Sequence, residues 1–580
     1  MTTSPPDATA SPVTAGPATD SDLQETPDIH GAYPRLTDDQ IAELEKRGQR
    51  RPTVQGEVLY RSGDIGCDFI VVLTGLVAVT EGFASPDDEP PPRVIAVHGP
   101  KRFLGELSVL TGQAVLLSAV VRAPGETLVV PIEGLKDAVA QDAALGDLIL
   151  RALIIRRNLH IGLGAGLRVL GSRFSPDARR LRDFLARNRV PHRWIDLETD
   201  QEAEAMLRHL GVSPEETPVV IWRGQQVLRN PTNAALAELL GLRQGPERSV
   251  CDLVVVGAGP AGLAAAVYGA SEGLATVVVE SVAAGGQAGT SSRIENYLGF
   301  PAGISGAELA DRAVIQARRF GAHITVPATA LGLSGNGGHH VLRLDGTEEV
   351  LARAVLIATG AQYRRLEVPG VQEFESSVYY AATEMEAAYC REEPVVVVGG
   401  GNSAGQAACF LADHAAQVHV VVRNPDLETD MSRYLADRIR RSPRITISLN
   451  TVVARLEGSR VLERVVLENV VTQEETVVPA HALFVFIGTQ PHVQWLGSSV
   501  ALDPEGFVLT GEPAEDALPA EPDDGVRTRL LLETTARGVF AAGDVRSGSV
   551  KRVAAAVGDG ALAVRLVHEH LERAGVGVHV

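Results

Sequence analysis

Two segments in the C-terminal half of the chain share one pattern of apolar and polar positions. Each begins with a short apolar run, passes through a glycine-rich turn into a helix-like stretch, and ends in a second apolar run. The first covers residues 251–280 and the second covers residues 393–423. Short apolar runs joined by a helix are typical of a strand–helix–strand unit with parallel strands. The pattern therefore predicts two such units in the same half of the chain.

The two turns carry glycine at the spacing of a dinucleotide-binding fingerprint. Their key positions are, in order, Gly257, Gly259 and Gly262 in the first turn, and Gly399, Gly401 and Ala404 in the second. Glycine lets the backbone approach a pyrophosphate, and the following helix offers its free N–H groups to it. A single turn of this kind is weak evidence, because glycine also occurs where a strand merely reverses into a helix. Two turns, each in a strand–helix–strand unit, predict two nucleotide sites.

The two units end in residues of opposite charge. The first ends in Glu280, an acid placed to accept hydrogen bonds from a ribose 2′-hydroxyl. The second ends in Arg423, which is placed to pair with a 2′-phosphate, although an arginine after a strand is often only a solvated side chain. We therefore expect FAD at the first unit and NADPH at the second.

The N-terminal half shows other patterns. Residues 1–33 are rich in Pro, Thr, Ala, Ser and Asp and are expected to form a disordered tail. Regularly spaced β-like runs between glycines predict a small antiparallel roll over 34–165. The order strand, helix, strand, helix, strand, strand, helix predicts a compact α/β unit over 166–245. The remaining chain is expected to divide into 249–365, 366–489 and 490–580, with an acidic, proline-rich exposed loop at 511–526.

Composition narrows the class of protein. The chain has 580 residues, of which 45% are hydrophobic and 22% charged, as is typical of a globular protein of several domains. A net charge of −19 argues against a nucleic-acid-binding surface. We find neither an apolar stretch of ~18 residues nor the features of a secretory signal, so no membrane association is expected. The scattered cysteines suggest a reducing, cytoplasmic environment; they are Cys67, Cys251, Cys390 and Cys409.

From residue 250 onward the chain resembles the low-molecular-weight thioredoxin reductases. The resemblance implies an FAD domain into which an NADPH domain is inserted, and we also expect a homodimer. The segments that carry it are GAGPAG (257–262), GGQ (285–287), ENYLGFP (295–301), ATG (358–360), GGGNSA (399–404), IGTQP (487–491) and FAAGDV (540–545).

The same resemblance assigns residues to the cofactors. Gln287 and Asn296 would lie beside the flavin, Asp544 would bind the ribityl chain, and the segment after Arg552 would approach the pyrimidine edge of the flavin. No residue is expected to act as a catalytic acid or base, because hydride transfer to a flavin needs none. The implied cofactor-binding set is Gly257, Gly259, Pro260, Ala261, Gly262, Glu280, Gly286, Gln287, Asn296, Thr359, Gly360, Gly399, Gly401, Asn402, Ser403, Ala404, Arg423, Gly488, Gly543, Asp544, Arg552, Val553 and Ala554.

The resemblance breaks where the family carries its redox-active Cys-x-x-Cys pair. Ala381 and Glu384 occupy the two cysteine positions. Alanine cannot form a thiolate, and glutamate has no two-electron thiol chemistry. Cys409 is expected to be a buried small apolar residue, and Cys390 is expected to be structural, with a redox role left open.

The roll resembles a cyclic-nucleotide-binding domain of the catabolite activator type. Residues 103–123 resemble its phosphate-binding cassette, and Glu106 matches the acid that holds the ribose 2′-hydroxyl. Leu117 stands where an arginine should pair with the cyclic phosphate, so we expect cyclic nucleotides to bind weakly or not at all. No helix-turn-helix follows the roll, which argues against a transcription factor.

The unit at 166–245 resembles a glutaredoxin or thioredoxin fold. Ser175 and Ala178 occupy its redox-cysteine positions, and Pro218 occupies the position of its cis-proline. A structural or docking role is therefore favoured over redox chemistry. The expected fold is multidomain: a β-roll, a thioredoxin-like α/β unit, and two Rossmann-like domains for FAD and NAD(P)H.

The leading functional hypothesis is an NADPH-dependent flavoprotein oxidoreductase. Its acceptor could be oxygen, a quinone or dye, a small redox protein that carries an iron–sulfur centre or flavin, or the disulfide of a partner. Two alternatives stay open. One is a redox-sensing or ligand-sensing regulatory flavoprotein with little turnover, and the other is a thioredoxin reductase that uses a partner's dithiol.

Overall fold

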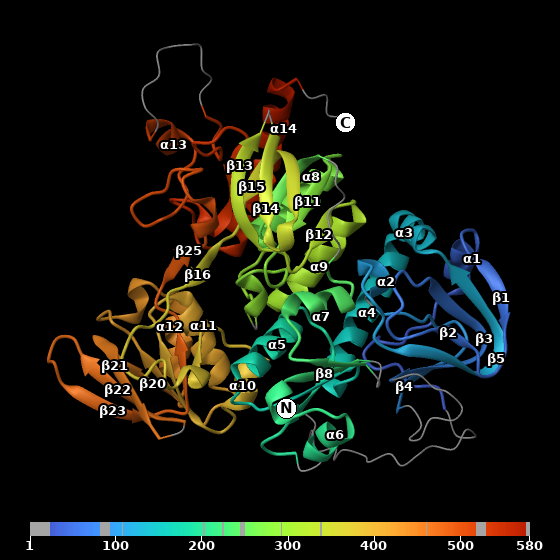
Figure 1. Cartoon of the computed structure of the whole chain (residues 1–580), viewed down its shortest axis with the longest axis horizontal. Helices are drawn as coiled ribbons and strands as arrows, with labels where there is room; N and C mark the ends of the chain where they lie inside the picture. The colour runs from blue at the N-terminus through green and yellow to red at the C-terminus, as the bar shows by residue number, and fades with distance from the viewer. Residues whose placement is uncertain are drawn as a thin grey trace, which may run out of the picture. The chain divides into compact units, whose positions relative to one another are not determined.

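A computed structural model describes residues 24–81, 93–106, 108–200, 203–222, 226–243, 250–291, 293–336, 339–459, 461–517 and 529–575 (Figure 1). The contacts among these residues divide the chain into two units. The first consists of Met1–Gly171 and Pro191–Asn230, and the second of Ser172–Val190 and Pro231–Val580.

The predicted roll is a five-stranded antiparallel sheet in the first unit. Its strand order is β1-β5-β3-β4, with β2 paired to β5. Phe69 and Phe103 are fully buried in it, with their ring centroids 5.2 Å apart. The strands are β1 (Gln49–Thr53), β2 (Val58–Tyr60), β3 (Phe69–Glu81), β4 (Arg93–His98) and β5 (Ser118–Val130), and the helices are α1 (Asp38–Glu45), α2 (Ser108–Thr111), α3 (Ile132–Gln141) and α4 (Ala143–Leu163).

Residues 24–33 correct the predicted tail. Ala32 and Tyr33 are buried, the amide of Thr26 donates to the carbonyl oxygen of Val97 on β4 (3.0 Å), and Glu25 pairs with Arg102 (2.8 Å). Composition favoured disorder here, but the buried side chains of Ala32 and Tyr33 and the polar contacts of Glu25 and Thr26 fix this segment to the roll. The rest of the predicted tail, residues 1–23, lies outside the described residues.

The predicted order of elements over 166–245 is confirmed. Four strands of the first unit form a sheet in the order β7-β6-β8-β9, in which β6 and β7 are parallel and the other pairs antiparallel. The Thr217–Pro218 peptide bond is cis. Two helices of this stretch, α5 and α7, belong to the second unit. The elements are β6 (Leu167–Gly171), α5 (Pro176–Arg187), β7 (His192–Asp196), α6 (Ala203–His209), β8 (Val219–Trp222), β9 (Gln226–Arg229) and α7 (Asn233–Leu239).

The second unit contains a seven-stranded sheet whose order is β12-β11-β10-β15-β14-β13, with β26 paired to β15 (Figure 1, green and yellow strands). Strands β10, β11, β12, β15 and β26 run parallel, as expected of a Rossmann-like domain. The elements are β10 (Cys251–Val256), α8 (Pro260–Ser271), β11 (Thr276–Val279), α9 (Gly306–Arg319), β12 (His323–Thr325), β13 (Ala330–Asn336), β14 (His339–Leu344), β15 (Glu349–Ile357), β26 (Val539–Ala541) and α14 (Val553–Arg573).

A second sheet, which is entirely parallel, is inserted between β15 and β26. Its strand order is β17-β24-β18-β19-β20. The chain enters and leaves the insertion through the antiparallel pair β16 (Ala361–Tyr363) and β25 (Thr489–Pro491). The elements are β17 (Val378–Tyr379), α10 (Glu384–Tyr389), β18 (Pro394–Val398), α11 (Asn402–Leu411), β19 (Gln417–Val421), α12 (Arg433–Arg441), β20 (Ile445–Ser448) and β24 (Ala482–Val485), with a three-stranded sheet of β21 (Thr451–Gly458), β22 (Leu462–Asn469) and β23 (Glu475–Pro479).

Two further observations bear on the sequence predictions. The loop predicted at 511–526 includes a short helix, α13 (Glu512–Asp516), and its later residues from 518 onward lie outside the described part. Among the helices that the structure describes, none is both long and apolar enough to cross a bilayer.

Candidate functional site

The first glycine turn joins β10 to α8 by a very close approach of backbone segments. Gly257 has φ +106°, and a Cβ there would lie 2.4 Å from the carbonyl oxygen of Ala358. A Cβ on Gly262 would lie 1.9 Å from the carbonyl oxygen of Gly257. Gly259 caps α8 without a side-chain hydrogen bond, and Pro260 and Ala261 begin its first turn. The N–H groups at the start of α8 are therefore available to an anion, as a bound pyrophosphate requires.

Glu280 lies beside this turn, where the sequence predicted it. Its carboxylate accepts hydrogen bonds from the backbone amides of Ala258 (2.8 Å) and Val282 (3.0 Å). These bonds hold the carboxylate at the end of β11 and next to the turn. A carboxylate at that position can also accept hydrogen bonds from a ribose hydroxyl.

Several distant segments converge on the start of α8. A Cβ on Gly286 would lie 3.0 Å from the Cα of Gly259, and a Cβ on Gly543 would lie 2.9 Å from the Cβ of Ala261. The hydroxyl of Thr359, next to Gly360, donates to the carbonyl oxygen of His492 (2.8 Å). The structure thus brings together four sequence segments assigned to FAD.

Most of the remaining predicted FAD residues adjoin these segments, and Asn296 is the exception. Gln287 follows Gly286 directly, and Arg552 caps α14, whose first turn contains Val553 and Ala554. Burial raises the pKa of Asp544, while Lys551 opposes the shift and donates to its backbone carbonyl (2.5 Å). Asn296 is exposed, and no contact places it at the turn. The structure therefore supports the predicted FAD contact of Asn296 less directly than it supports the contacts of the residues around the first turn.

The second glycine turn has the same construction. Gly399 has φ +141°, and a Cβ there would lie 2.4 Å from the carbonyl oxygen of Phe486. Gly401 caps α11 and has open space where a Cβ would be. Ser403 bonds to the hydroxyl of Tyr363, and Gly488 (φ +101°) accepts a bond from the amide of Arg364 (3.0 Å). Arg423 is exposed where β19 ends, as a partner of a 2′-phosphate must be.

The start of α12 lies beside this turn, which the sequence pattern did not predict. The amide of Ser432, the N-cap residue of α12, donates to Asn402 Oδ1 (2.8 Å). The fingerprint ends at Arg423, so the residues after it carried no expectation. An N-cap serine before the amphipathic stretch RYLADRIRR was the signal that could have indicated this helix.

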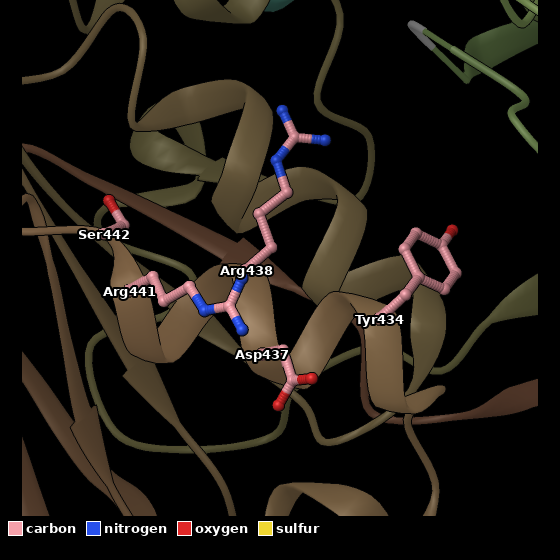
Figure 2. Close-up of a pocket in the computed structure, with 5 residues that line it drawn as sticks. All are labelled: Tyr434, Asp437, Arg438, Arg441 and Ser442. Carbon is pink, nitrogen blue, oxygen red and sulfur yellow. The ribbon is translucent and has the colours of Figure 1, made fainter.

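A cavity of about 470 Å³ lies along α12. Figure 2 shows the side chains that line it, which project from this helix and the residue after it. Arg438 also pairs with Glu295 (3.8 Å), which belongs to the domain of the seven-stranded sheet. The lining residues are Tyr434, Asp437, Arg438, Arg441 and Ser442.

The four thiols are poorly suited to redox chemistry. Burial raises the pKa of Cys390 and of Cys251 to about 12 and that of Cys67 to about 11, and it also raises the pKa of Cys409. The Cys390 thiol donates to the carbonyl oxygen of Glu386 (2.9 Å) inside the inserted domain. Since the thiolate is the reactive form, burial disfavours the reactive form of each of these groups.

The cassette of the roll is built around Glu106. Its buried carboxylate accepts bonds from the amides of Leu116 (3.2 Å) and Leu117 (3.0 Å). The Leu117 side chain is itself fully buried, so no cation stands in the position of the expected arginine. Arg156 on α4 donates instead to the carbonyl oxygen of Gly105 (3.1 Å).

In the segment 166–245, Ser175 has a structural role. Its hydroxyl accepts a bond from the amide of Ala178 (3.3 Å) and so caps α5. Ala178 is buried. The two redox-cysteine positions thus hold a helix cap and a core residue, while the glutaredoxin resemblance of the whole segment stays a prediction.

Comparison with known families decides the class. Residues 251–560, more than half of the chain, match the family of pyridine nucleotide-disulphide oxidoreductases. The chain belongs to this family. Residues 50–142 match the cyclic nucleotide-binding domain, which confirms the class of the roll.

Individual relatives agree with this assignment. The chain is 34% identical over 323 residues to a thioredoxin reductase of Treponema pallidum (strain Nichols), which covers 55% of this chain and 97% of that protein. It is 32% identical over 327 residues to a 34.2 kDa protein in the rubredoxin operon of Clostridium pasteurianum, which covers 56% and 98%. The solved thioredoxin reductases of Lactococcus lactis and T. acidophilum each match with 28% identity and a TM-score of 0.50, over 56% of this chain and 99% of theirs. The predicted oxidoreductase class is confirmed, and this thioredoxin reductase-like family uses FAD and NADPH.

The first turn generates a prediction about flavin binding. Gly262→Ala would place a methyl group 1.9 Å from the carbonyl oxygen of Gly257, so the turn must open and release its ligand. We expect at least about 100-fold weaker FAD binding, measured as flavin absorbance per protein chain after purification. Gly335→Ala on β13 is the control, because open space surrounds that position. Full flavin content in the Gly262 variant would contradict the assignment.

The cassette generates a prediction about pH. Burial raises the pKa of Glu106 from 4.5 to about 7, against the lowering effect of its two amide donors. The roll therefore loses stability as pH rises through this interval, by an amount on the order of 3 kcal/mol. Burial lowers the pKa of His160 to about 4 and that of His98 well below its usual range, so both histidines act in the opposite direction as pH falls below 6.5.

Because these effects oppose one another, the informative quantity is the difference in free energy of unfolding between the wild type and Glu106→Gln. Relative to the wild type, the variant should gain stability between pH 5 and pH 8. Hydrogen exchange of β3 and β5 would measure the change. Glu133→Gln, at a highly exposed position on α3, should show no such trend. If the stability difference between Glu106→Gln and the wild type stays constant from pH 5 to pH 8, the raised pKa of Glu106 is contradicted.

Proposed function

We propose that this chain is an NADPH-dependent flavoprotein reductase that delivers electrons to an external acceptor. The observation that carries the proposal is the pair of glycine turns, each at the carboxyl edge of parallel strands in its own sheet, combined with four thiols whose protonated form burial favours. When bound, FAD would take a hydride from NADPH and pass electrons onward one or two at a time. The chain itself would position the two nucleotides and exclude the internal dithiol route.

The residues around each turn support separate roles for the two sites. At the first turn, Glu280 and the start of α8 would hold the adenosine ribose and pyrophosphate of FAD. At the second turn, the start of α11 would hold the pyrophosphate of NADPH, and Arg423 would pair with its 2′-phosphate. The amide of Ser432 fixes Asn402 beside that second turn.

We infer that the acceptor is a separate molecule, with a small redox protein as one candidate. Ala381 stands at the first cysteine position of the family motif, and the nearest thiol, Cys390, is buried and bonded to a backbone carbonyl. We further propose that the roll serves as a docking or dimerisation module, because Leu117 removes the charge that would recognise a cyclic phosphate. A homodimer and a cytoplasmic location remain predictions.

The test of nucleotide use is an anaerobic titration at the flavin absorbance. We expect NADPH to reduce the flavin at lower concentrations than NADH. Arg423→Glu should weaken the binding of NADPH by about tenfold or more and the binding of NADH much less, because it replaces a phosphate partner with a repulsive charge. Arg565→Glu, at an exposed position on α14, is the matched control. Equal affinity of the wild type for both nucleotides would refute the role of Arg423.

The test of the electron route uses the cysteines. Replacement of all four by serine should leave flavin reduction by NADPH largely intact, since none of the thiols is activated. Candidate acceptors are then admitted to the reduced protein, and reoxidation of the flavin is followed. If Cys390→Ser alone abolishes turnover with a disulfide acceptor while reduction by NADPH persists, that residue belongs to the redox route and the proposal is wrong.

A further inference from the structure

Helix α5 comes from the thioredoxin-like segment, yet its contacts place it with the nucleotide-binding domains. Residues Ser172–Val190 belong to the second unit, whereas the strands on either side of α5 in the sequence belong to the first. The helix is amphipathic and twelve residues long, which is about 18 Å from end to end. It is long enough to contact two domains with its two ends.

The N-terminal half of α5 contacts the inserted domain. Arg179 donates through Nη1 to the carbonyl oxygen of Glu375 (2.8 Å) and through Nη2 to that of Ser376. Its guanidinium also lies 5.7 Å from the ring centroid of Tyr379 on β17. One arginine thus donates to two consecutive carbonyl oxygens and lies over an aromatic ring, a geometry that a lysine cannot reproduce.

The middle of α5 faces α10 of the same domain. The pKa of Glu386 on α10 is raised, first by its burial and in addition by the charge of Asp183 on α5. Burial also raises the pKa of Asp183. The charge of Asp183 reaches Glu386, so the middle of α5 lies close to α10.

The C-terminal end of α5 contacts the FAD domain. The amide of Asn188 donates from Nδ2 to the carbonyl oxygen of Val282, two residues after Glu280 (2.9 Å). Arg189 pairs with Asp311 on α9 (2.7 Å), and both side chains are only 16% exposed. An ion pair shielded to this degree is screened by salt much less than a surface pair.

We propose that α5 is a brace that holds the FAD and NADPH domains in one relative orientation. Otherwise the described links between the domains are the strand pair β16–β25 and contacts such as Arg438 with Glu295. A pair of strands at one side acts as a hinge, and a contact at a second position removes that freedom. Arg179, Asn188 and Arg189 are thereby positioning residues of the reductase, although they lie outside both nucleotide domains. The inference concerns domain geometry and does not rest on the proposed function.

The brace is tested by the distance between two nitroxide labels, one in each domain. Leu331→Cys on β13 and Val477→Cys on β23 provide exposed attachment sites, at 49% and 53% exposure. Cys251, Cys390 and Cys409 are buried, and the half-buried Cys67 is replaced by serine so that it takes no label. In the full chain with FAD bound, we expect a single narrow distance distribution by pulsed electron paramagnetic resonance, with or without NADP⁺.

A brace fails when either of its ends is released. Arg179→Ala and Arg189→Ala should therefore each broaden the distribution to a similar extent, and the double variant should broaden it no further. Asp311→Ala should reproduce Arg189→Ala from the other side of the ion pair, and Arg189→Lys should restore the narrow distribution. Arg565→Ala on α14 is the control. Retained flavin absorbance shows that each variant is folded.

Three results would overturn the proposal. They are a broad distribution in the wild type, a narrow one in both single variants, and broadening that simply adds in the double variant. The measurement involves no turnover of NADPH, so failure of the proposed function leaves it unaffected. Stopped-flow reduction of the flavin by NADPH provides a second readout, in which the two single variants and the double variant should change the rate by the same factor.

Discussion

The nucleotide-binding half depends on how closely backbone segments approach at two strand-to-helix turns. A Cβ on Gly262 would lie 1.9 Å from a carbonyl oxygen, and a Cβ on Gly399 would lie 2.4 Å from another. These approaches direct the first N–H groups of α8 and α11 toward the carboxyl edges of the two sheets. At the second turn the third position is Ala404, and a Cβ on Gly399 would lie 3.2 Å from the Cβ of Ala404, which is a tight contact. The chemistry that the protein supports follows from this exclusion of side-chain atoms.

Desolvation is a second constraint that recurs across the chain. It keeps the four thiols protonated, and it raises the pKa of Glu106 in the roll and of Glu386 in the inserted domain. In each case a group that could carry charge is held in a setting that favours its neutral form. Two positions at which the sequence resemblances imply reactive or ligand-binding groups serve packing and hydrogen bonding here. They are Ser175, which caps a helix, and Leu117, which is buried.

Local patterns predicted the elements and both turns, because apolar runs and glycine spacing are properties of neighbouring residues. The order of elements over 166–245 and the position of Glu280 followed from such patterns. The contacts of α5 did not, because Arg179 bonds to backbone carbonyls, which any residue type provides. Residues 24–33 were misjudged for a related reason, since average composition conceals two apolar side chains that find a partner on β4. The surroundings of Asn296 were inferred by resemblance alone, and the structure leaves that residue exposed.

The position of α5 has a consequence for the order in which the chain is made. Arg179 bonds to residues 196 and 197 positions later, so α5 leaves the ribosome long before its binding surface exists. The strands β6 and β7 on either side of it can pair as soon as both are synthesised, whereas α5 must wait for β17 and its neighbours. Contacts this distant in sequence form late and carry a large loop-closure cost. The Arg179 contacts of α5 therefore form only after residues 375 and 376 have been synthesised, so α5 reaches its final contacts later than its neighbouring strands reach theirs.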